Sequence, residues 1–162
     1  MKLYSSSKDF PAIFENGKRK ILEVFKDCKI YHVGSTAVPG LGGKGIIDIL
    51  ITIDDWGKEE ELIEKLKGLG FSHIHEREDN RRFLSREVKD DKLKETHLHI
   101  VKEGSKEEKE IIAFKDYLIS NPQEAKKYHD VKLKLKEEDP EEYSERKGEC
   151  IGKILKKALF RE

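Results

Sequence analysis

The chain contains only two cysteines, Cys28 and Cys150, which lie far apart and form no CxxC pair. This usage favours a reducing compartment over a disulfide framework and offers no zinc-finger spacing. The first ten residues, MKLYSSSKDF, contain no apolar segment of the kind found in signal peptides, and no apolar run approaches the length of a membrane span. We therefore expect a cytoplasmic protein with no membrane partner.

An excess of charge of one sign is also missing, because 33 basic side chains are balanced by 33 acidic ones. Proteins that bind nucleic acid broadly along its backbone usually carry a basic excess. The composition therefore argues against broad nucleic-acid binding, while a local basic pocket stays compatible with it. The length of 162 residues predicts a single domain, 1–162, with a core of its own. Nothing in the sequence predicts the oligomeric state.

Several catalytic signatures are absent as well. The chain has no Walker A motif, no GxGxxG ahead of a helix and no GxSxG nucleophile motif. These absences exclude several common classes of enzyme, so the function has to be inferred from other motifs.

The hydrophobic periodicity predicts an α+β fold, a small mixed sheet with an N-terminal helix and a C-terminal helical cap. Helices are expected over residues 9–26, 56–67, 105–121, 122–138 and 140–160. Strands are expected over residues 30–33, 46–53, 71–75, 82–88 and 96–101. Residues 76–81 are too polar for a strand and are interpreted as a turn.

A single carboxylate, Asp48, interrupts the β-branched run of residues 46–53. Burying an ionised group without a partner is costly, so Asp48 is expected near an open strand end or in a chemical role. The alternative is a structural role, in which Asp48 is paired with a nearby Arg or Lys. A Gly34-Ser35 turn precedes this strand, and Gly allows backbone amides to approach a phosphate closely.

The string HVGSTAVPGLGGKGIIDI, residues 32–49, resembles the signature of the GrpB family, a nucleotidyltransferase-fold family of bacterial proteins with poorly defined function. THLHIV and FKDYLISNPQEAKKYHDVKLKL follow in the family's order, so the resemblance covers nearly the whole chain. Two positions depart from the family pattern: Gly45 stands where Pro is usual, and Lys115 where Arg is usual.

The resemblance implies a nucleotide or phosphorylated small molecule as ligand, with Asp48 holding Mg²⁺. Magnesium prefers carboxylate and phosphate oxygens, and guanidinium groups contact phosphate in a bidentate manner. For Ser35 the alternative is a turn or helix-capping role, and for Lys44 a solvated loop position. The candidate phosphate-binding residues are Gly34, Ser35, Thr36, Lys44, Arg82 and Arg86.

Two histidines, His97 and His99, are spaced to point to the same face of a strand, about 7 Å apart. They could bind phosphate as cations, act as acid and base, or ligate a metal. Combined with Asp48 they would form a His-His-carboxylate set, which suits a transition metal better than magnesium. The alternative is a pair of hydrogen-bonded polar residues in a sheet. His73 and His75 form a second pair of this kind on a less certain strand.

The catalytic interpretation has one gap. Active nucleotidyltransferases usually carry Asp-x-Asp on this strand, whereas Leu50 occupies the second position here. Asp54 lies about 20 Å from Asp48 along an extended strand, too far to share a metal. Three hypotheses stay open: an Mg²⁺-dependent nucleotidyltransferase with Asp48, His97 and His99 as catalytic residues, a non-catalytic ligand-binding module, and an interaction protein using the charged C-terminal helices.

Overall fold

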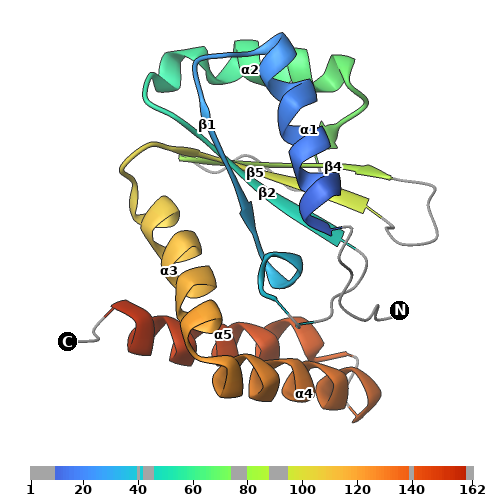
Figure 1. The fold of residues 1–162 in the computed structure, drawn as a ribbon, viewed down its shortest axis with the longest axis vertical. Coiled ribbons are helices and arrows are strands. Elements are labelled where there is room, and N and C mark those ends of the chain that lie inside the picture. Colours follow the sequence, from blue (N-terminus) through green and yellow to red (C-terminus); the bar gives the residue numbers. More distant parts are fainter. Residues whose placement is uncertain are drawn as a thin grey trace. The chain divides into compact units, whose positions relative to one another are not determined.

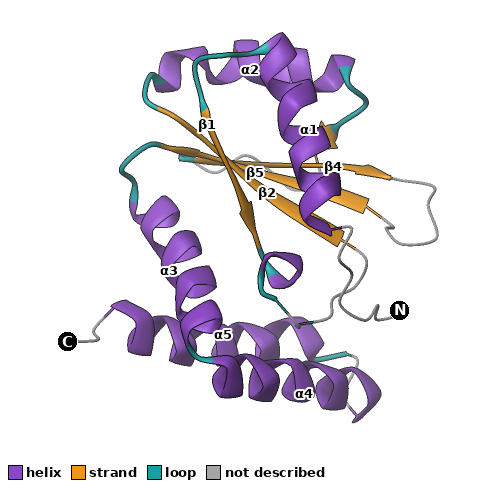
Figure 2. Ribbon diagram, viewed as in Figure 1, coloured by secondary structure: helices purple, strands orange, loops and turns teal. Residues whose placement is uncertain are grey.

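The computed structural model describes residues 10–39, 41, 46–73, 80–87, 95–138 and 141–159 (Figures 1 and 2). The strands are β1 (Lys29–Val33), β2 (Ile46–Ile53), β3 (Ser72–His73), β4 (Arg81–Glu87) and β5 (Glu95–Lys102). The helices are α1 (Phe10–Val24), α2 (Glu59–Gly68), α3 (Lys106–Ser120), α4 (Pro122–Glu138) and α5 (Tyr143–Leu159), with short 3₁₀ turns at Ser35–Ala37 and Trp56–Lys58. The predicted α+β fold is confirmed. The chain divides into two compact units, Met1–Lys109 and Glu110–Glu162, and its description as one domain stays a prediction.

The sheet has five strands in the order β1-β2-β5-β4-β3. Strands β2 and β5 are parallel, and the other neighbouring pairs are antiparallel. The run of β-branched residues in β2 suits an interior strand with neighbours on both edges, as predicted. The parallel pairing sets Asp48 opposite His97, and Leu50 opposite His99.

One face of the sheet forms the hydrophobic core with α1 and α2. Alternation along β2 sends Ile47, Ile49, Ile51 and Ile53 into this core, and all four are buried. Asp48, between them, consequently points to the opposite face. The rest of this core consists mainly of Phe10, Phe14, Ile21, Phe25, Leu62, Ile63, Leu66, Leu84, Leu98 and Ile100.

The second unit contains most of α3 with α4 and α5. Ser105 Oγ accepts a hydrogen bond from the Glu108 N–H at 3.2 Å at the start of α3, as expected of a helix cap. Phe114 of α3 and Tyr128 of α4 meet edge to face with ring centroids 5.5 Å apart.

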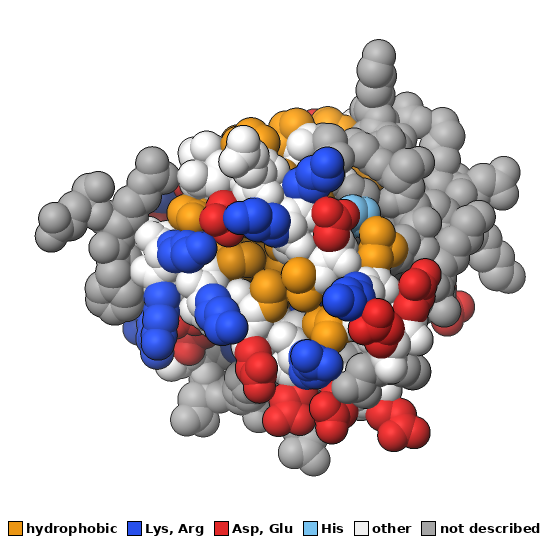
Figure 3. Space-filling model, turned by 90° about the horizontal axis from the view of Figure 1, so that it is seen from below, with side chains coloured by type: hydrophobic (Ala, Val, Ile, Leu, Met, Phe, Trp, Pro, Cys, Tyr) orange, Lys and Arg blue, Asp and Glu red, His pale blue; other side chains and the backbone are white. Residues whose placement is uncertain are grey.

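Figure 3 shows a face of the molecule on which both signs of charge are interspersed around apolar side chains. No described helix is long and apolar enough to cross a membrane.

An ion pair joins the sheet to α2. Arg82 Nε of β4 lies 2.5 Å from Glu59 Oε1, and only 11% and 7% of the two side chains are exposed. The guanidinium also lies 5.3 Å from the centroid of the Trp56 ring. The two charges of this pair therefore compensate each other where little water reaches them.

Replacing Arg82 by Met should lower the free energy of unfolding by about 3–5 kcal/mol, because the buried Glu59 carboxylate would lose the guanidinium charge beside it. The matched control is Arg19→Met on α1, whose pair with Glu23 is 67% and 62% exposed and should contribute less than about 1 kcal/mol. Urea unfolding of both variants makes the comparison. Equal, small losses in the two variants would show that the Arg82 pair is not a structural link.

Candidate functional site

Gly34 lies directly against the Asp48 carboxylate. β1 pairs Val33 with Asp48, and Gly34 follows with φ of 75° and ψ of −171°. A Cβ at this position would stand 2.4 Å from Asp48 Oδ2. Glycine is thus required twice, by its backbone conformation and by the close approach of the carboxylate. The 3₁₀ turn Ser35–Ala37 begins immediately after it.

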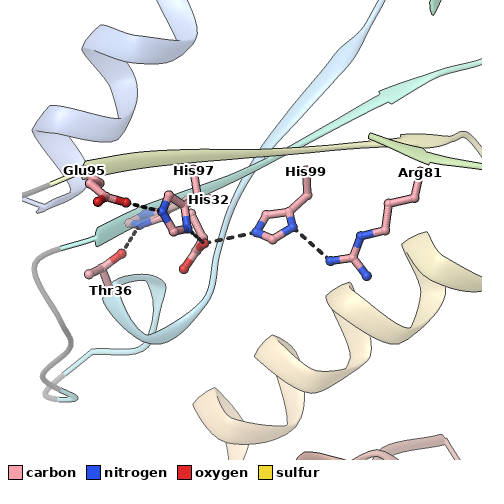
Figure 4. A network of polar contacts seen from close by, with 7 residues as sticks. His32, Thr36, Arg81, Glu95, His97 and His99 are labelled. Atoms are coloured by element: carbon pink, nitrogen blue, oxygen red, sulfur yellow. Dashed lines mark hydrogen bonds and ion pairs between the residues drawn. The ribbon is translucent and has the colours of Figure 1, made fainter. Parts of the chain in front are cut away.

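A chain of polar contacts runs from Asp48 across β5 to β4 (Figure 4). His99 Nε2 lies 3.1 Å from Asp48 Oδ1, and His99 Nδ1 lies 3.0 Å from Arg81 Nη2. On the other side, His97 Nδ1 lies 3.8 Å from Asp48 Oδ1, and His97 Nε2 lies 2.6 Å from Glu95 Oε2. The Asp48 side chain is 24% exposed, so the carboxylate is accessible to solvent while being held on two sides.

The partners of His99 determine its tautomer. A guanidinium has only donors, so Arg81 must donate to an unprotonated Nδ1 of His99. The ring is then neutral with its proton on Nε2, which donates to Asp48 Oδ1. In this arrangement His99 orients the carboxylate, and its Nε2 has no lone pair for a metal or a substrate proton.

His97 is arranged differently. Glu95, as a carboxylate, accepts the hydrogen bond from His97 Nε2–H, which leaves Nδ1 facing Asp48. Phe83 packs edge-on against both histidine rings, with centroids 5.1 Å from His97 and 4.7 Å from His99. Glu95 therefore fixes the orientation of His97, and the second ring nitrogen is directed to the Asp48 side.

Among the described side chains, Asp48 is the one whose position in the site fits Mg²⁺. Within the described ranges, no three His, Cys, Asp or Glu side chains are grouped so as to hold a metal. Mg²⁺ is commonly held by one or two carboxylates together with the phosphates of a ligand, so Asp48 can serve as its single protein ligand. A transition-metal site with His99 does not fit, because Arg81 fixes the proton on His99 Nε2. Leu50, where a second carboxylate would stand, is 0% exposed.

The remaining predicted ligand residues of the turn differ in placement. Ser35 follows Gly34 and is partly buried at the start of the 3₁₀ turn. Thr36 is buried, and its Oγ1 lies 2.9 Å from His32 Nε2, so its hydroxyl stabilises the turn itself. Lys44 and His75 lie outside the described residues.

The two arginines predicted from the sequence are not at this site, which corrects that prediction. Arg82 and Arg86 alternate with Phe83 along β4 and therefore point to the core face of the sheet. Arg82 is paired with Glu59, and Arg86 Nη1 donates to the Leu69 carbonyl oxygen at 3.0 Å.

The arginine at the site is Arg81, which sequence reasoning placed in a turn. The strand begins at Arg81 and pairs with β5 so that Phe83 lies opposite His99. A shift of one residue in a strand exchanges its two faces, and only the pairing with β5 settles which arginine reaches the histidines.

This sheet, with a Gly-Ser turn beside a carboxylate on an interior strand, resembles a nucleotidyltransferase fold. The Cid1 poly(U) polymerase bound to MgATP superposes with a TM-score of 0.56 at 12% identity, over 82% of this chain and 43% of that one. At this identity the similarity shows the fold alone.

The family is shown by closer matches. The model of the family described as GrpB protein matches residues 1–157, and the chain belongs to this family. It is 31% identical over 163 residues to the glutamate-rich protein GrpB of Alkalihalophilus pseudofirmus, covering 94% of this chain and 92% of that protein. A UPF0157 protein of Streptomyces coelicolor is 30% identical over 145 residues, 87% of this chain and 75% of the relative. The structure of the conserved protein GrpB from Enterococcus faecalis superposes with a TM-score of 0.84 at 28% identity, over 99% of this chain and 98% of that one.

Replacing Gly34 by Ala should destabilise the protein by about 2 kcal/mol or more, because the backbone conformation suits only glycine and the new methyl group would displace Asp48. Gly152→Ala in α5 is the control, since a Cβ there meets nothing within 4 Å. That change should stabilise the helix by up to about 1 kcal/mol. The two substitutions should change the melting temperature in opposite directions. An unchanged melting temperature in Gly34→Ala would contradict the close contact between Gly34 and Asp48.

Proposed function

We propose that this protein binds a nucleotide or a phosphorylated small molecule at the Gly34-Ser35 turn, beside Asp48. The observation that carries the proposal is the contact of the Gly34 backbone with a solvent-accessible carboxylate on an interior strand. The fold supports it by analogy, since a polymerase of similar fold is described as bound to MgATP.

The chemical fit of this site to phosphate rests on three groups. The glycine backbone allows close approach of an anion, and the Ser35 hydroxyl can donate to a phosphate oxygen. Asp48 repels an anion on its own, so a cation is needed between them. Mg²⁺ held by Asp48 and the phosphates would neutralise this charge and polarise a phosphoryl oxygen.

His97 is the residue suited to proton transfer if the ligand reacts. An acceptor oxygen would attack phosphorus, the bond to the leaving phosphate or pyrophosphate would break, and the acceptor's proton would pass to His97 Nδ1. The resulting imidazolium would lie between two carboxylates, Glu95 and Asp48, which stabilise its charge. His99 would keep Asp48 in place throughout.

A second candidate, binding without transfer, is favoured by one observation. Leu50 occupies the place of the second carboxylate and is fully buried beside His99 in the strand register. A two-metal site for phosphoryl transfer therefore lacks one of its ligands. Release of pyrophosphate from a nucleoside triphosphate with Mg²⁺ would distinguish transfer from binding alone.

Replacing Asp48 by Asn should keep the fold, because the Asn Oδ1 can still accept the hydrogen bond from His99 Nε2–H. Stabilisation by MgATP, MgUTP and the other Mg-nucleotides should disappear in this variant, since the amide is a poor magnesium ligand. A ligand at a hundred times its Kd raises the free energy of unfolding by about 2.7 kcal/mol, which a melting experiment resolves.

The control for this change is Asp54→Asn, an exposed carboxylate just beyond the end of β2 that should leave ligand stabilisation intact. If the same Mg-nucleotides still stabilise Asp48→Asn, the metal role of Asp48 is contradicted. A large loss of stability without any ligand would instead identify Asp48 as a structural residue.

A further inference from the structure

A cavity lies on the face of the sheet opposite Asp48, between α1 and the strands. Its volume is about 240 Å³, and Ile13 of α1, Ile47 and Ile49 of β2, and Phe71 contribute apolar wall. Ile47 and Ile49 flank Asp48 in β2 and point away from it, so the cavity is separate from the site described above. In Figure 1, α1 runs across this face of the sheet.

The polar lining of the cavity is basic. Arg86 and the exposed Lys20 both line it, together with Asn16 and Thr96, and none of the described lining residues is acidic. Among the described lining residues, a ligand with a negative charge would therefore meet two cations and no carboxylate.

Arg86 is oriented by its neighbours and has N–H donors besides the one that bonds to Leu69. Its Nη1 donates to the Leu69 carbonyl oxygen at 3.0 Å, and its guanidinium lies 4.6 Å from the centroid of the Phe71 ring. In the described part of the chain no carboxylate lies within ion-pair distance of it, whereas Arg82 on the same face is paired with Glu59. A guanidinium has five N–H donors and is always charged, so Arg86 offers a fixed cationic fork at the wall of an apolar cavity.

Gly17 keeps the cavity open. It lies inside α1, where glycine costs about 1 kcal/mol relative to alanine. A Cβ at this position would meet Ile49 Cδ1 at 3.5 Å, an ordinary contact, so the packing of α1 on the sheet does not require glycine. The missing side chain instead leaves space along the cavity wall, which Gly17 itself lines.

We propose that this cavity binds a small monocarboxylate with a short hydrocarbon body, its carboxylate paired with Arg86 and its body against the isoleucines. A planar carboxylate matches the guanidinium fork in a bidentate pair. Pockets for drug-sized ligands measure about 300–1,000 Å³, so a cavity of about 240 Å³ takes a smaller molecule. The site does not depend on the proposed function at Asp48.

The test uses hexanoate as the probe and the methyl signals of isoleucine in NMR spectra of the full chain. Hexanoate should shift the signals of Ile13, Ile47 and Ile49 in a saturable manner, while hexylamine should not. Arg86→Met keeps the length of the side chain and removes its charge, and it should weaken binding by about tenfold or more, the effect of a lost hydrogen bond to a charged group. Arg19→Met, at an exposed position of α1 that does not line the cavity, should leave binding unchanged.

A second variant keeps the proposal testable if Arg86→Met fails to fold. Gly17→Leu places a side chain in the cavity at a helical position that favours leucine, and it should abolish binding while preserving the fold. The proposal is overturned if hexanoate gives no saturable shifts or if hexylamine binds equally well. Binding that survives in every folded variant would also overturn it, and tighter binding of hexyl phosphate than of hexanoate would overturn the assignment to carboxylates.

Discussion

The contact between Gly34 and the Asp48 carboxylate is the constraint on which this site depends. An interior strand suits apolar residues. A carboxylate is stable there only when neighbouring groups form hydrogen bonds with it and compensate its charge. His99 donates to one oxygen, His97 Nδ1 lies 3.8 Å from the same atom, and the other oxygen faces a residue without a side chain. The absence of a side chain at Gly34 lets the turn and the carboxylate lie in direct contact.

The polar contacts around Asp48 also distinguish His97 from His99, although the two are the same type of residue. His97 and His99 are equivalent in the sequence, two residues apart on one strand. Arg81 makes the difference, because it donates to the second nitrogen of His99, whereas Glu95 accepts from the second nitrogen of His97. One histidine therefore donates to Asp48, and the other turns its second nitrogen toward the same carboxylate.

The sequence predicted the parts of this structure that follow from local patterns. The β-branched run predicted the strand that contains Asp48, and the spacing of His97 and His99 predicted that both face one side of a strand. That these strands are neighbours was expected from the resemblance to the GrpB family, and the pairing of β2 with β5 brings the three residues together. The arginines could not be chosen in the same way, because β4 begins one residue earlier than its apolar pattern indicated and only pairing fixes its faces. The cavity beside Arg86 depends on how α1 lies on the sheet, which no spacing in the sequence reveals.

Alternation in β2 gives the two sides of the sheet different chemistry. Asp48 and the polar chain occupy one face, while the isoleucines, α1 and the Arg86 cavity occupy the other. The two candidate ligand sites therefore lie on opposite faces of the same strand.

The most direct test of the central claim maps backbone amide signals during titration with Mg-nucleoside triphosphates. The amide signals of Gly34 and Ser35 should move together with that of Asp48, and they should move only when Mg²⁺ is present. Signals of these residues that stay fixed, while those elsewhere in the chain respond to the nucleotide, would contradict it.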